Sequence, residues 1–138
     1  MCHSSDVTLK VHLRPGQSIF DQVVFAAQRA LISGELVEGQ AFPSVRALAA
    51  ELKIHPNTAH KVVQHLIQER LLEVLPGIGT VVAKTPRARA ADKKRLLQDE
   101  VEALVVEAKR VGAALTEVIE ALESRWGELE RSKEERRA

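Results

Sequence analysis

The sequence predicts a mainly helical fold with a small β-hairpin, divided into an N-terminal domain (residues 1–84) and a two-helix C-terminal segment with its linker (residues 85–138). Three stretches of the N-terminal part carry apolar residues at helical spacing. A short strand–turn–strand pattern follows them. Beyond it, apolar residues recur at alternating intervals of four and three, which is typical of helices that pack on other helices.

The N-terminal domain opens with an alternating pattern. Apolar and polar residues alternate from Val7 to Leu13, which predicts a half-buried strand. Ser18 can cap a helix that runs to about Ser33, where Gly34 stops it. The residues at 37–39 then predict a turn.

Two shorter helices and a hairpin complete this domain. The first helix spans residues 44–52, with Ser44 as its cap, and a three-residue connection leads to a second helix over residues 56–69. Strands at 71–75 and 80–83 flank a tight Pro-Gly turn. Two short helices followed directly by a hairpin describe a winged helix-turn-helix.

The C-terminal segment contains a regular apolar series. Its members are Leu97, Val101, Leu104, Ala108, Val111, Leu115, Val118 and Leu122. Gly112 costs about 1 kcal/mol inside a continuous helix, so we predict two helices, about 88–110 and 114–134, folded as a hairpin. A single unbroken coiled coil is the alternative, because the series continues in register across Gly112.

Composition excludes several classes of protein. The longest apolar runs are far shorter than the roughly 20 residues needed to span a bilayer, and the first residues lack the pattern of a signal peptide. A single cysteine, Cys2, fits a reducing compartment, so we expect a cytoplasmic protein. Phosphate-loop, nucleophile-elbow and zinc-protease motifs are absent from the sequence, and His55, His60 and His65 lack partner ligands. We therefore predict no enzyme activity, cofactor or metal site.

The net charge of +1 conceals one basic stretch. Residues 84–95 hold one acidic residue, Asp92, beside Lys84, Arg87, Arg89, Lys93, Lys94 and Arg95. Such a stretch suits a polyanion partner, although a solvated linker has the same composition.

Five pieces of the sequence, in order and at matching spacing, resemble the DNA-binding domain of GntR-family transcription regulators. They are IFDQV at 19–23, ISGELVEG at 32–39, PSVRALAAEL at 43–52, PNTAHK at 56–61 and GIGTVVA at 77–83. In the tail, AKRVG at 108–112 and EVIEALE at 117–123 resemble the short YtrA-like subfamily. The resemblance implies a dimeric DNA-binding repressor, in such families often one that controls transporter genes near its own.

Candidate DNA contacts follow from the helix over residues 56–69. The major groove admits one helix, whose first residues face the base edges. The candidates on this helix are Asn57, Thr58, His60, Lys61 and Gln64. Asn57 and Thr58 have an alternative role as helix caps. His60 stands where many relatives have arginine or another polar residue, so base preference cannot be carried over.

Further candidates lie on either side of that helix. The resemblance places a DNA-contacting arginine at Arg46; the alternative is an ion pair with Glu51. Ser44 is mainly a cap whose hydroxyl can also meet phosphate. The wing tip contributes Gly77, Gly79 and Thr80, which are expected to form a tight turn and, in the functional interpretation, also to approach DNA closely. Relatives commonly have a basic residue where Ile78 stands and a serine cap where Ala114 stands.

The tail predicts a homodimer. The residues expected to be buried between subunits are Leu97, Val101, Leu104, Val111, Leu115, Val118, Ile119 and Leu122. Trp126 and Leu129 either extend that seam or close only the local hairpin. A tail of this length is too short to enclose a metabolite, so an unidentified small-molecule effector would bind between subunits or at the domain junction. The alternative function is a winged-helix protein-interaction module without specific DNA binding.

Overall fold

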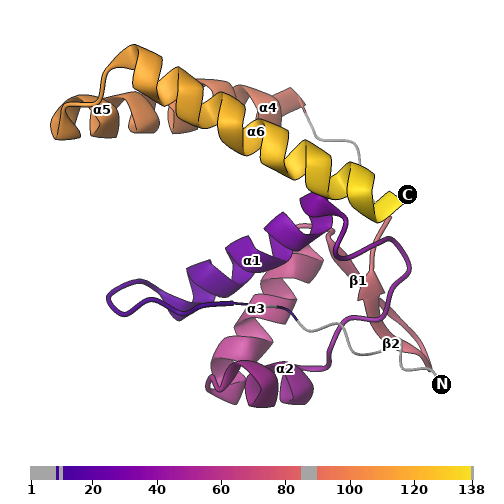
Figure 1. The fold of residues 1–138 in the computed structure, drawn as a ribbon. Helices are drawn as coiled ribbons and strands as arrows, with labels where there is room; N and C mark the ends of the chain where they lie inside the picture. Colours follow the sequence, from indigo (N-terminus) through magenta and orange to yellow (C-terminus); the bar gives the residue numbers. More distant parts are fainter. Residues whose placement is uncertain (1–8, 10, 85–89, 138) are drawn as a thin grey trace.

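The computed structural model describes Leu9, residues 11–84 and residues 90–137. The elements, in chain order, are α1 (Ile19–Ser33), α2 (Val45–Leu52), α3 (Pro56–Gln68), β1 (Leu72–Leu75), β2 (Gly79–Val82), α4 (Ala90–Arg95), the π-helical stretch η1 (Leu96–Glu100), α5 (Val101–Val111) and α6 (Leu115–Arg137). We call the described residues 9–84 the head and residues 90–137 the tail. Figure 1 shows α1 lying between the tail and the other two helices of the head.

The first helix begins and ends where the sequence predicts. The Ser18 Oγ accepts a hydrogen bond from the Asp21 amide at 3.2 Å, which satisfies one of the free N–H groups at the helix start. Gly34 ends the helix with φ +83°, a conformation that favours glycine. The capping residues therefore fix both ends of α1.

The strand predicted over Val7–Leu13 is wrong for the residues that the structure describes. Leu9 and residues 11–13 belong to no strand, and Val7 lies outside the described residues. Leu9 is nevertheless buried, and Val11 and Leu13 pack against the core. An alternating apolar and polar pattern requires only that every second side chain faces the core. An extended segment that pairs with no other strand can satisfy this requirement too.

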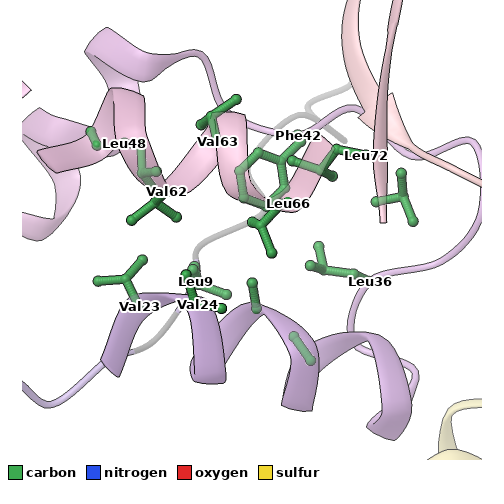
Figure 2. Packing of buried hydrophobic residues seen from close by; sticks show 14 of the residues in the cluster. Leu9, Val23, Val24, Leu36, Phe42, Leu48, Val62, Val63, Leu66 and Leu72 are labelled. Carbon is green, nitrogen blue, oxygen red and sulfur yellow. The ribbon is translucent and has the colours of Figure 1, made fainter. Parts of the chain in front are cut away.

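The hydrophobic core lies where α3 packs against α1 and α2. Its most completely buried large side chains are Val23, Leu48, Val62 and Leu66. Figure 2 shows Val62 and Leu66 facing α1. Every member of this cluster comes from residues 9–82, so the head has a complete core without the tail.

Shortening Leu48 to alanine is expected to lower the free energy of unfolding of the head by about 2–5 kcal/mol, because the side chain is 0% exposed and its removal leaves a cavity. Urea unfolding followed by circular dichroism measures the change. Ile78→Ala is the matched control, since Ile78 is 74% exposed at the wing tip. A Leu48→Ala protein as stable as the control would contradict this account of the core.

The hairpin is joined by a third extended segment that the sequence did not reveal. β1 and β2 pair antiparallel, with Leu72 opposite Val82 and Leu75 opposite Gly79. On the other edge of β2, the Phe42 amide donates to the Thr80 carbonyl at 2.9 Å, and the Val82 amide donates to the Gln40 carbonyl at 2.8 Å. The chain that leads into α2 is thus hydrogen-bonded to the wing, which fixes the start of α2 relative to it.

The tail is two helices rather than one coiled coil, as the glycine predicted. Gly112 ends α5 with φ +79°, and α6 begins at Leu115. The Glu117 Oε1 accepts a hydrogen bond from the Ala114 amide at 2.8 Å. This bond is the glutamate half of a capping box, and Ala114 has no side-chain oxygen to supply the other half.

Within the described part of the chain, no helix is both long enough and apolar enough to cross a membrane.

Candidate nucleic-acid interface

The connection between α2 and α3 determines where the first turn of α3 lies in the head. Lys53 ends α2 with φ +55°. The next residue, Ile54, is buried, and its amide donates to the Ala49 carbonyl at 3.0 Å. Figure 1 shows α2 lying across the first turn of α3, at the end of the head farthest from the tail. The first turn of α3 lies at that end of the head, where Pro56 and Asn57 are exposed.

His55 is the cap of α3, a role that the sequence analysis missed. Its Nδ1 accepts a hydrogen bond from the Asn57 amide at 3.0 Å. Asn57 itself is exposed, and within the described residues its side chain forms no hydrogen bond with the helix start. Because His55 is the cap, Asn57 does not have the capping role that the sequence left open. Histidine could have been considered as a cap, because its ring nitrogen accepts hydrogen bonds.

The outer face of α3 carries most of the predicted contacts. Asn57, Lys61 and Gln64 fall at intervals of four and three, so they share one face of the helix, and all three are exposed. His60 is exposed beside them, whereas Thr58 is half-buried. The structure thus brings four of the five predicted residues onto open surface and turns Thr58 partly toward the core.

Arg46 lies on the exposed side of α2, next to the cap of that helix. The ion pair with Glu51 does not form among the residues that the structure describes. The Ser44 Oγ accepts from the Ala47 amide at 3.1 Å, which confirms Ser44 as the helix cap. Arg46 is thereby free to reach a partner from the surface that also carries the start of α3.

The wing tip is an uncharged turn. The Ile78 amide donates to the Leu75 carbonyl at 3.0 Å, and Gly77 and Gly79 both have positive φ. Thr80 is half-buried. From residue 72 to residue 82 the only charged side chain is that of Glu73. Any contact that this wing makes with nucleic acid therefore rests on backbone amides and apolar surface, and adds no cation.

The basic stretch does not adjoin the start of α3 within one chain. Lys93 and Lys94 are exposed on α4, which Figure 1 places on the far side of α1 from α2. Arg95 pairs with Glu100 at 3.1 Å. Arg87 and Arg89 lie outside the described residues. Around α2 and α3, the exposed basic residues are Arg46, Lys53 and Lys61 instead.

Comparisons with known proteins agree with this geometry. Residues 21–82 match the family described as "Bacterial regulatory proteins, gntR family". The HTH-type transcriptional repressor YtrA of Bacillus subtilis is 25% identical over 113 residues, which cover 81% of this chain and 87% of that protein. An uncharacterized HTH-type transcriptional regulator of the same organism, YhcF, is 27% identical over 106 residues, which cover 77% of this chain and 84% of that protein.

A solved structure shows that the likeness extends to the fold of the tail. The crystal structure of a transcriptional antiterminator from Listeria monocytogenes EGD-e superposes with a TM-score of 0.76 at 19% identity and covers 87% of this chain and 90% of that chain. At that identity the superposition shows the fold alone. Together with the match of residues 21–82, these findings show that the chain carries a DNA-binding domain of the gntR type and is similar to bacterial transcription regulators over most of its length.

Proposed function

We propose that the chain acts as a homodimer that binds an inverted-repeat operator and represses transcription. The observation that carries this proposal is the uncovered apolar surface of the tail. None of the described residues of the tail is buried in the single chain. A helical segment gains most of its stability by burying an apolar face against a partner, so this tail needs one.

The apolar residues of the tail are large and closely spaced. Of the predicted dimer residues, Leu97, Val101, Leu104, Val111, Leu115, Ile119 and Leu122 are between 40% and 73% exposed, and Val118 is half-buried. Leu96, Val105 and Val106 add further exposed apolar surface that the sequence analysis left out of the seam, and Trp126, for which it left two roles open, is 74% exposed. A second copy of the same tail would cover this surface, because each copy carries the same apolar face and leaves it exposed among the residues that the structure describes.

The polar end of the head supplies the operator contacts. In a two-fold dimer the exposed starts of the two α3 helices would enter successive major grooves, about 10 bp apart. The Asn57 side chain can donate one hydrogen bond to adenine and accept another from it, and Lys61 can neutralise the charge of a phosphate. Bound across a promoter, such a dimer blocks transcription sterically. The relative YtrA is itself described as a transcriptional repressor, which supports repression rather than activation.

Selection of bound fragments from the source genome by the purified full chain tests the proposal. We expect wild type to enrich a short inverted repeat, and Asn57→Ala to lose that enrichment while the protein stays folded. Binding to the enriched site should also weaken steeply with salt, since each phosphate contact releases counterions. Fragments enriched equally by both proteins, or none enriched by either, would instead favour the protein-interaction module.

A further inference from the structure

Among the residues that the structure describes, one ion pair joins the tail to the head. Arg136, near the end of α6, donates from Nη2 to the Glu35 Oε1 at 3.1 Å, across 101 positions of sequence. The remaining described ion pairs of the tail connect neighbours along one helical run, namely Arg95–Glu100, Glu107–Arg110 and Arg125–Glu128. Figure 1 shows the end of α6 lying against the end of α1, and the two helices are in contact.

The head side of this contact is rigid. Glu35 follows Gly34, the cap of α1, and stands between Ser33 and Leu36, which are 5% and 2% exposed. The Leu36 amide donates to the Ala30 carbonyl at 3.1 Å, which closes the turn onto the helix. Because Ser33 and Leu36 are anchored in the core, the backbone of Glu35 is held in place, while its side chain is 48% exposed and available to Arg136.

The tail approaches the same turn closely. A Cβ added to Gly34 would meet the Arg136 Cδ at 3.6 Å and the Lys133 Cα at 3.8 Å, so α6 approaches the cap of α1 to within about the width of one methyl group. We call this combination of Glu35, Arg136 and the close approach of α6 to Gly34 the clasp. It holds one end of a helix whose other end leads to the exposed apolar residues of the tail.

We infer that the clasp sets the distance between the two DNA-reading surfaces of the dimer, and that Glu35 and Arg136 are positioning residues for operator recognition. This inference rests on the proposed dimer. With 23 residues, α6 is about 34 Å long at a rise of about 1.5 Å per residue. A tilt of about 10° at the clasp displaces the far end by about 6 Å, which is nearly two steps of about 3.4 Å along DNA. A small rotation at this contact therefore changes the half-site spacing that the dimer fits.

Four full-length proteins test the clasp: wild type, Arg136→Gln, the charge swap Glu35→Arg/Arg136→Glu, and Arg125→Gln. Arg125→Gln is the matched control, because it removes the same charge from the same helix but breaks a pair within α6. Binding is measured on operator duplexes recovered by genomic selection, with one or two base pairs inserted or deleted between half-sites, and on a duplex with a single half-site.

We expect Arg136→Gln to bind the native spacing about three- to tenfold more weakly than wild type, because two half-exposed pairs are lost per dimer. The affinity of Arg136→Gln should vary less with half-site spacing than that of wild type, and its affinity for the single half-site should be unchanged. The charge swap should restore the wild-type dependence of affinity on spacing. A profile for Arg136→Gln that matches Arg125→Gln would overturn the inference. So would an equal loss on every duplex, which indicates lost phosphate attraction only.

A second measurement needs no DNA. Spin labels attached at Gln68→Cys, an exposed position at the end of α3, in a Cys2→Ser background report the distance between the two heads of the free dimer. The distribution should be narrow in the wild-type background and broad with Arg136→Gln. Equal widths would count against the clasp. A wild type that is monomeric, or that is indifferent to spacing, would instead show that the proposed function is wrong.

Discussion

Arg46→Ala is expected to weaken operator binding by about 30-fold or more while leaving the fold intact. A guanidinium that contacts a base or phosphate contributes about 1–3 kcal/mol of discrimination, and a dimer presents two such groups. Arg46 is exposed on α2 beside the first turn of α3, and it forms no ion pair with the described residues that its loss would disrupt. Titration of a fluorescent operator duplex at fixed salt measures the affinity.

Arg125→Ala is the control for this prediction, since it removes the same side chain from α6, on the far side of α1 from α2. It should bind within about twofold of wild type. Measuring both variants over a range of salt separates two roles for Arg46. A pure phosphate contact lowers the salt slope by about one for each arginine lost, whereas a base contact lowers affinity most on the native sequence. An Arg46→Ala protein that binds like the control would remove Arg46 from the interface.

Leu104→Asp is expected to convert the dimer into a monomer and to reduce operator binding to that of a single head. Leu104 is 40% exposed in the single chain and belongs to the apolar series of α5. In the dimer the aspartate would be buried without a partner, at a cost of several kcal/mol in each subunit. Sedimentation equilibrium measures the association state, and titration of the operator duplex measures the consequence for DNA.

The conservative change Leu104→Met provides the matched control, because it keeps the volume and apolar character of the side chain and should leave the dimer intact. Both variants should retain the unfolding transition of the head, whose core contains no residue of the tail. A Leu104→Asp chain that still sediments as a dimer would show that α5 faces away from the subunit interface.

Local chemistry made most of the helix boundaries predictable. Ser18, Ser44 and Gly34 are residues whose side chains, or lack of one, satisfy the free backbone groups at a helix end, and each occupies the position that its chemistry predicts. Gly112 likewise divided the tail into two helices. The outer face of α3 could be predicted too, because the helical period that buries Ala59 and Val63 leaves Asn57 and Lys61 outside.

Features that depend on distant parts of the chain could not be predicted. The alternation around Leu9 does not distinguish a strand from an unpaired segment, since only a neighbouring strand makes the difference. The pairing of Gln40 and Phe42 with β2 involves residues about 40 positions apart, with two helices and a strand between them. The contact of Glu35 with Arg136 depends on how the tail folds back over α1, which no local pattern encodes.

The position of α1 between the DNA-reading surface and the tail has an evolutionary consequence. In the proposed dimer, a substitution on the outer face of α3 would change which sequence is read without altering which chain is chosen as partner, and a substitution on α5 would do the reverse. After a gene duplication, two copies could therefore acquire incompatible tails and stop forming mixed dimers while still recognising the same sites, or diverge in their sites while still pairing. The buried face of α1 packs towards α3. Substitutions on that face would therefore affect sequence recognition and partner choice only through the stability of the head.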